Sequence, residues 1–318
     1  MLELLTTIFL ILNSTVTIIG CLVNLFLLHI VLFHSPKIIK TFSIVIINLA
    51  LTNIGACLSG FSIGQRIIPS GKRLFYISYG LCSWIGEQFC FDVFGALLHF
   101  HTHALWLIFV SFAYRYYVML RNEPSRLALQ LSILLIYIPS LVQLLAMFFQ
   151  NLRIEEIRNL LNAAYPEYNL TGLTVTGAVK TLEFAPLYTL IHMTVVSTPI
   201  TIGIQIFKRR IIKLLTTRGV DLSSKTRNLH AQLLRTLTFQ STVPLIYIFG
   251  VFCFVLSHFW SHPILEYFTV IPPLVVPILT PFSCIFYVTP YRYYVFCLIS
   301  QKLHPKNSIH TVSAVFVD

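Results

Sequence analysis

Apolar residues fall into seven long runs along the chain, separated by short polar segments. The runs cover about residues 4–33, 42–63, 89–120, 127–150, 184–207, 237–260 and 267–289. A helix needs roughly 20 mostly apolar residues to cross a bilayer, so each run is long enough. Backbone polar groups must be paired within the segment in lipid, which favours helices. We therefore predict an all-α integral membrane protein, a single seven-transmembrane helix bundle over residues 1–318, with 290–318 as a short cytoplasmic tail.

The third run differs from the others because it carries polar and charged residues at a few separate positions along its length. Asp92 and Arg115 are the only formally charged side chains between Phe91 and Leu120. Three histidines lie in its middle, at His99, His101 and His103. An intramembrane ionisable residue is by default a candidate functional site. We expect this run to be the central helix, with a ligand end near Asp92 and a signalling end near Arg115.

Composition supports a membrane protein and excludes other classes. The chain is 56% hydrophobic and 10% charged, whereas soluble domains carry about 25% charged residues. The net charge of +11 does not indicate nucleic-acid binding, because the basic residues lie in short connections between apolar runs. No Gly-rich phosphate loop, HExxH or GxSxG motif occurs, and the acids do not cluster in the spans. We predict no enzyme activity, no cofactor and no nucleic-acid partner; the partner implied by composition is the lipid bilayer.

The distribution of basic residues orients the bundle. Of the 22 Lys and Arg residues, one set of alternate connections holds only Arg66, Lys72, Arg73, Arg153, Arg158 and Lys180. The richer set faces the cytoplasm by the positive-inside rule, which places the N-terminus outside. A glycosylation sequon at Asn169 lies in the connection 151–183, on the predicted outer face. In the basic connection 208–236 we expect the flanking helices to continue into the cytosol, where they either anchor to anionic lipid or dock a partner.

Several motifs, taken together, resemble one receptor family. They are Gln65–Gly71, Tyr76–Cys82, Ser111–Tyr117, Ala164–Asn169, Gln240–Pro244 and Val288–Arg292, and they cover nearly the whole chain in order. The chain resembles the nematode chemoreceptors, most closely the serpentine receptor class delta. The resemblance implies a GPCR-like receptor for a small-molecule chemical ligand, coupled to a heterotrimeric G protein. It also implies a multi-pass protein of the plasma membrane, in the cilia of sensory neurons.

Two departures from rhodopsin-type receptors stand out. The third span carries Tyr114 where those receptors carry an acid before the arginine, so the acid–arginine lock is absent. The connection 151–183 contains no cysteine, so Cys82 pairs elsewhere or stays free. Cys90 is the nearest candidate on the outer side, and a spacing of eight residues does not decide between these alternatives.

The candidate switch lies at the cytoplasmic ends of the third and seventh spans. The resemblance favours a G-protein-coupling role for Tyr114, Arg115, Tyr116, Pro290, Tyr291 and Arg292. The alternative is an interfacial arginine flanked by aromatic residues, which are common at membrane boundaries.

The candidate ligand pocket comprises Asp92, His99, His103 and Trp106. Asp92 either binds the ligand, pairs with a loop arginine such as Arg66, or simply favours a helix N-terminus. His99 and His103 share a helix face and His101 points away. A metal site would need a third ligand, so we predict none and favour hydrogen bonds across the bundle. The alternative function for such a layout is a ligand-gated channel or transporter.

Overall fold

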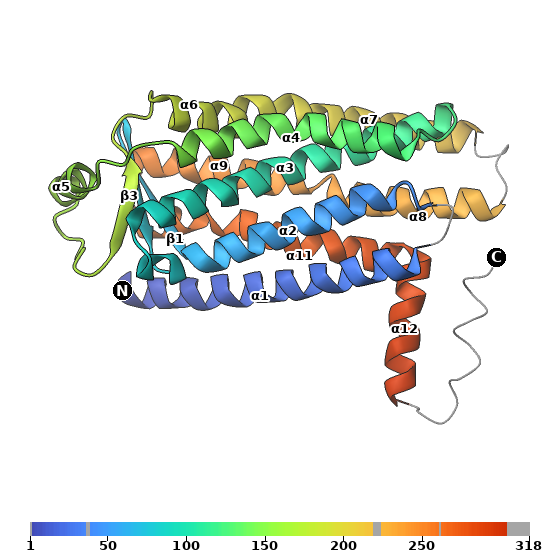
Figure 1. Cartoon of the computed structure of the whole chain (residues 1–318), viewed down its shortest axis with the longest axis horizontal. Helices are drawn as coiled ribbons and strands as arrows, with labels where there is room; N and C mark the ends of the chain where they lie inside the picture. The colour runs from blue at the N-terminus through green and yellow to red at the C-terminus, as the bar shows by residue number, and fades with distance from the viewer. Residues whose placement is uncertain (1, 36–38, 219–223, 261, 304–318) are drawn as a thin grey trace.

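The computed structural model describes residues 2–35, 39–218, 224–260 and 262–303, which form an elongated bundle of helices lying side by side (Figure 1). Within these residues, 7 helices are long and apolar enough to cross a membrane. The prediction of a seven-span helical bundle is therefore confirmed. The spans are α1 (Leu2–His34), α2 (Ser43–Ile63), α3 (Glu87–Leu120), α4 (Arg126–Phe148), α6 with η3 and α7 (Phe184–Ile191, His192–Val196, Ser197–Arg218), α8 with α9 (Ser224–Gln240, Val243–Phe259), and α10 with α11 (Pro263–Phe268, Ile271–Tyr287).

Helix α3 is the central element of the bundle. In its most apolar stretch 72% of the residues are buried, against 17–56% in the other six spans. It packs on α2, α4 and α7, so side chains at every depth of α3 contact other spans. The other spans turn large apolar residues such as Leu135, Phe252 and Phe286 outward, as lipid-facing surfaces require.

The outer connections form a three-stranded antiparallel sheet that the pattern of apolar runs did not predict. Strands β1 (Gln65–Ser70) and β2 (Arg73–Ser78) make a hairpin, and β3 (Thr174–Ala178) pairs with β2. The register places Gly177 opposite Phe75. A Cβ on Gly177 would lie 2.2 Å from the Leu74 carbonyl oxygen, so only glycine allows this close pairing. Helix α5 (Ile154–Ala164) packs on β3.

Cys82 forms a disulfide with Cys90, which decides the alternative that the sequence left open. The bond joins η2 (Leu81–Trp84) to the first turn of α3. The second outer connection is therefore held to the bundle through the pairing of β3 with β2, and not through a cysteine.

A proline in the seventh span is accommodated by a polar side chain of the first span. Pro281 has no N–H, so the carbonyl of Pro277 four residues earlier lacks its helical donor. The Asn24 amide donates to this carbonyl at 2.7 Å and to the Gly20 carbonyl at 2.7 Å. The Asn53 amide in turn donates to Asn24 Oδ1 at 3.2 Å. These bonds fix α1, α2 and α11 together inside the bundle.

At the inner end, the helices flanking the basic connection extend beyond their apolar runs, as expected. Helix α7 continues to Arg218 and α8 begins at Ser224. Helix α12 (Thr289–Leu303) follows α11 and projects away from the end of the bundle, roughly at right angles to the spans (Figure 1). Residues 304–318 of the predicted cytoplasmic tail lie outside the described residues.

Asn169 is exposed in the connection between α5 and β3, on the predicted outer side. A second sequon residue, Asn13, is 2% exposed inside the bundle, where a glycosyltransferase has no access. We therefore expect the receptor expressed in animal cells to carry one N-glycan. Treatment with an N-glycosidase should increase its gel mobility, and Asn169→Gln should abolish that shift while Asn13→Gln leaves it. An unglycosylated Asn169 together with a C-terminal tag accessible from outside would contradict the proposed orientation.

Candidate functional site

A cavity of about 160 Å³ lies in the outer half of the bundle. Its walls come from α3, from Met147 of α4, from α6 with η3 and the start of α7, from α9, and from the segment joining α10 to α11 with Pro273 of α11. The α3 wall is formed by Phe94, Leu97, Leu98, His101, Thr102 and Leu105, and the opposite wall by Thr189, Leu190, Met193, Tyr247, Val251 and Phe254. Convergence of several spans on one apolar cavity is typical of a small-molecule site.

The outer sheet forms the roof of this cavity. Ile67 of β1 and Leu74 and Tyr76 of β2 line it, and Tyr76 packs on the Phe94 ring with centroids 4.7 Å apart. The sheet thus lies between the cavity and the outer solution. A movement of the sheet would therefore change the shape of the cavity.

Two polar atoms in the cavity wall have no hydrogen-bond partner within the described residues. His101 Nδ1 lies 3.0 Å from the Tyr247 hydroxyl, but His101 Nε2 is buried and unpaired. The Thr189 hydroxyl is also buried and unpaired. Among the described residues of the walls there is no Asp, Glu, Lys or Arg.

A polar chain crosses the bundle beside the cavity. Trp106 Nε1–H donates to His192 Nε2 at 3.2 Å, so the His192 proton resides on Nδ1, which donates to Gln143 Oε1 at 2.7 Å. The Thr102 hydroxyl is 3.3 Å from the same oxygen. His192 begins a π-helical turn, η3, whose residues Met193 and Thr194 line the cavity. Such turns are frequent at functional sites, and here one turn connects the cavity wall to α3 and α4.

The four residues predicted for the ligand pocket lie elsewhere around α3. Asp92 Oδ1 accepts a hydrogen bond from Gln88 Nε2 at 3.0 Å. His99 and His103 are buried with their rings against Tyr137 of α4, at centroid distances of 5.0 and 4.9 Å. Trp106 donates to His192. None of the four is among the residues that form the cavity, and a contact between any of them and a ligand stays a prediction.

The three histidines divide between two faces of α3 as the helical spacing predicts. The His99 and His103 rings are stacked 6.1 Å apart, while His101 contacts Tyr247 of α9. In the part of the chain that the structure describes, no three His, Cys, Asp or Glu side chains are grouped so that they could hold a metal ion.

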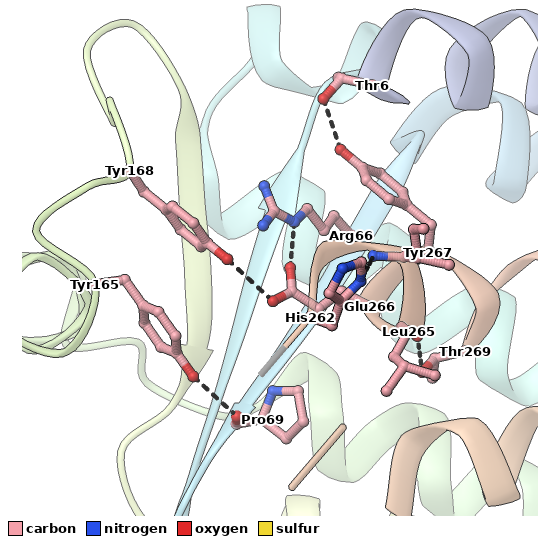
Figure 2. A network of polar contacts seen from close by, with 11 residues as sticks. Thr6, Arg66, Pro69, Tyr165, Tyr168, His262, Leu265, Glu266, Tyr267 and Thr269 are labelled. Carbon is pink, nitrogen blue, oxygen red and sulfur yellow. Dashed lines mark hydrogen bonds and ion pairs between the residues drawn. The ribbon is translucent and has the colours of Figure 1, made fainter. Parts of the chain in front are cut away.

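A buried ion pair ties the roof to the outer end of the seventh span (Figure 2). Arg66 of β1 pairs through Nε with Glu266 of α10, and both side chains are 2% exposed. The Tyr168 hydroxyl donates to Glu266 at 3.2 Å, and the Arg66 guanidinium lies 4.5 Å from the Tyr168 ring centroid. The suggested pairing of Arg66 with Asp92 is therefore wrong. The partner of Arg66 is Glu266, because β1 packs on α10.

The electrostatics of this cluster keep Arg66 protonated. Burial lowers the pKa of Arg66, but the Glu266 carboxylate together with Tyr79 and Tyr168 outweighs burial and holds the Arg66 pKa above its ordinary value. Burial and the Glu266 charge raise the pKa of Tyr168, so Tyr168 stays a neutral donor. The first outer connection, the second outer connection and the seventh span thus meet at one carboxylate.

At the inner end of α3, Arg115 is buried without an acid partner. Its side chain is 6% exposed, and Nε and Nη2 have no hydrogen-bond partner within the described residues. The guanidinium lies 3.9 Å from the centroid of the Phe42 ring, a cation–π contact. The nearby acid Glu123 instead accepts a hydrogen bond from the Tyr114 hydroxyl at 2.7 Å. The tyrosine that replaces the usual acid is therefore hydrogen-bonded to the nearby carboxylate.

The other predicted switch residues differ in their burial and in their hydrogen bonds. Tyr291 is buried and its hydroxyl lies 2.9 Å from Ser35 Oγ. Burial raises the Tyr291 pKa, and the charge of Arg115 partly opposes this rise. The Tyr116 hydroxyl accepts from Arg210 at 3.4 Å. Pro290 is half-buried at the start of α12, and Arg292 is exposed.

Sequence reasoning missed the residues that define the cavity and its roof. Tyr247, His192 and Thr189 look like ordinary polar positions in apolar runs, and nothing in their spacing pairs them with α3. A signal did exist for Glu266, which is an acid between apolar residues at the start of the seventh run. Its partner could be identified only once β1 was known to be a strand.

Comparisons with known proteins agree with this architecture. Residues 9–297 match the family model for the serpentine type 7TM GPCR chemoreceptor Srd. The chain is 33% identical to serpentine receptor class delta-19 of Caenorhabditis elegans over 282 residues, covering 86% of this chain and 83% of that relative. It is 34% identical to serpentine receptor class delta-18 of the same organism over 281 residues, with the same coverage. The crystal structure of squid rhodopsin has a similar fold, with a TM-score of 0.62 at 13% identity, over 95% of this chain and 87% of that one. This chain therefore belongs to the serpentine receptor class delta family of seven-transmembrane, GPCR-like chemoreceptors.

Proposed function

We propose that this receptor binds a small external chemical in the cavity beneath the outer sheet and signals to a heterotrimeric G protein inside the cell. The observation that carries the proposal is the cavity itself. It is about 160 Å³ in volume, is lined by spans three to seven, and touches the π-helical turn of span five. A ligand that contacts several of these spans gains different binding free energy in different helix arrangements. Such a difference is what shifts a conformational equilibrium.

The signalling end of this proposal is Arg115. Cavity residues such as His101 and Leu105 lie on the same helix as Arg115. In the present arrangement Arg115 is 6% exposed and its guanidinium lies against the Phe42 ring, so a cytosolic partner has little access to it. Separation of the inner ends of the spans would expose the guanidinium to a docking partner. Tyr114, Tyr116, Pro290, Tyr291 and Arg292 form the surroundings that this movement would rearrange.

The family of the chain supports the cellular setting. A chemoreceptor of external compounds acts in the plasma membrane, and we place this one in the cilia of sensory neurons. The basic inner connection, with Lys208, Arg209 and Arg210 at its start, supplies the positive surface expected where a G protein docks beside anionic lipid.

A cavity-filling variant tests the proposal. Cells expressing the receptor with a G-protein activation reporter are screened with small molecules, and an active compound is then applied to Val251→Trp and Val255→Trp. Val251 lines the cavity, whereas Val255 is 46% exposed on the lipid side of the same helix. We expect Val251→Trp to weaken the response at least tenfold and Val255→Trp to leave it near the wild-type value. Equal responses of the two variants would contradict the cavity as the ligand site. An ionic current that persists without G protein would favour the channel alternative.

A further inference from the structure

The cavity combines an apolar wall with two buried hydrogen-bonding atoms that have no partner among the residues that the structure describes. His101 is 5% exposed, and its Nε2 atom has no partner within the described residues. The Thr189 hydroxyl faces the same cavity from α6 and is unpaired as well. A buried polar atom without a partner is energetically costly, so a ligand that supplies the missing hydrogen bond gains affinity here.

The remaining wall excludes charged ligands. Among its described residues there is no side chain of opposite charge for either an anion or a cation. A charged group transferred from water into this cavity would lose its hydration without compensation. Selectivity against ions is therefore built into the residue types of the wall.

The size of the cavity limits the ligand further. An engineered apolar cavity of roughly 150 Å³ in another protein accommodates benzene, and the cavity here is about 160 Å³. We infer that this receptor takes an uncharged, mostly apolar ligand of single-ring size, with one hydroxyl or carbonyl group that hydrogen-bonds to His101 Nε2 or Thr189 Oγ1. This inference rests on the proposed function, since it assigns the ligand class of the same cavity.

Four probes of similar size test the inference on the full-length receptor in lipid nanodiscs. They are toluene, phenol, benzoate and benzylamine, the last two being charged at neutral pH. Dissociation constants come from the probe-dependent shift of the unfolding temperature. We expect binding of phenol and toluene, with the hydrogen bond worth roughly tenfold in favour of phenol, and no saturable binding of the two ions. Saturable binding of benzoate or benzylamine would overturn the inference.

The polar contact is tested by a ratio that cancels partitioning into lipid. The toluene-to-phenol ratio of dissociation constants is measured for the wild type, His101→Phe, Thr189→Val and the control Thr198→Val, which lies on the exposed side of α7. We expect the ratio to fall roughly tenfold in His101→Phe or Thr189→Val and to stay unchanged in the control. An unchanged ratio in both wall variants would overturn the assignment of the polar contact. If His101→Phe does not fold, Thr189→Val and the charged probes still decide the question.

Measuring binding and signalling separately distinguishes a failure of the proposed function from a failure of the inferred ligand class. The nanodisc measurement contains no G protein, so the expected selectivity can be observed even if the receptor activates none, and then only the proposed function fails. Conversely, G-protein activation by a charged compound that Val251→Trp weakens would support the proposed function and overturn the ligand class.

Discussion

The variant Arg115→Met is expected to abolish ligand-dependent G-protein activation and, at the same time, to make the receptor more stable. Methionine keeps the apolar contact of the long side chain with the Phe42 ring but removes a charge. That charge is 6% exposed, and two of its nitrogens lack partners. Relief of this unpaired buried group should stabilise the fold by about 1–3 kcal/mol. Loss of the guanidinium removes the group that the open inner face would present to the G protein.

Both parts of this prediction have direct measurements. G-protein activation is compared at equal surface expression, and stability is measured by reversible denaturation in mixed micelles. Arg121→Met is the matched control, because Arg121 is exposed in the turn just after α3 and should change neither quantity. Normal activation by Arg115→Met would show that Arg115 is not the switch. A loss of stability would show that the arginine supports the fold.

The variant Glu266→Ala is expected to destabilise the receptor by about 3–5 kcal/mol, because it leaves the Arg66 guanidinium buried and unpaired. Arg66 and Glu266 are each 2% exposed, and Tyr168 also donates to this carboxylate. One substitution therefore removes the common partner of β1 and of the second outer connection. Weaker ligand binding should accompany the loss of stability, since the same strands form the cavity roof.

Two comparisons isolate the buried charge in the Glu266 experiment. Glu183→Ala removes an exposed ion pair with Arg153 at 2.8 Å, whose side chains are 50% and 36% exposed, and should cost less than about 1 kcal/mol. The double variant Arg66→Met/Glu266→Leu should recover much of the loss of Glu266→Ala, since neither charge then remains buried. A double variant that is less stable than Glu266→Ala would show that the pair contributes net stability in its own right.

Much of the fold was predictable because a membrane constrains it strongly. Seven apolar runs can satisfy their backbone in lipid only as helices, and α3 could be identified as central from its polar side chains alone. The outer sheet was not predictable from those runs, because it lies in the connections. Residues 65–78 do contain strand-forming Ile, Phe and Tyr around a Ser70–Gly71–Lys72 turn, a hairpin pattern. The third strand, however, comes from about 100 residues later in the chain, and no local pattern specifies that pairing.

The positions of the residues at the inner end were easier to predict from the sequence than the lining of the cavity. Arg115 and its tyrosines lie together at the inner end because they are neighbours on one helix. The cavity depends on which face of α3 meets α6 and α9, and the histidine pattern alone favoured His99 and His103. The structure turns those two toward Tyr137 and places His101 in the cavity. Helical spacing separates the two faces of α3 but does not say which face the ligand meets.

The pairing of β3 with β2 also has an evolutionary consequence. The sheet is joined by backbone hydrogen bonds, which do not depend on side-chain identity. Ile67, Leu74 and Tyr76 can therefore change in a duplicated gene without detaching the second outer connection, as long as Gly177 and the Arg66–Glu266 pair remain. Mutation of these three positions would reshape the roof of the cavity while the seven spans stay intact. A receptor built in this way can acquire a new chemical preference through a few substitutions in one hairpin.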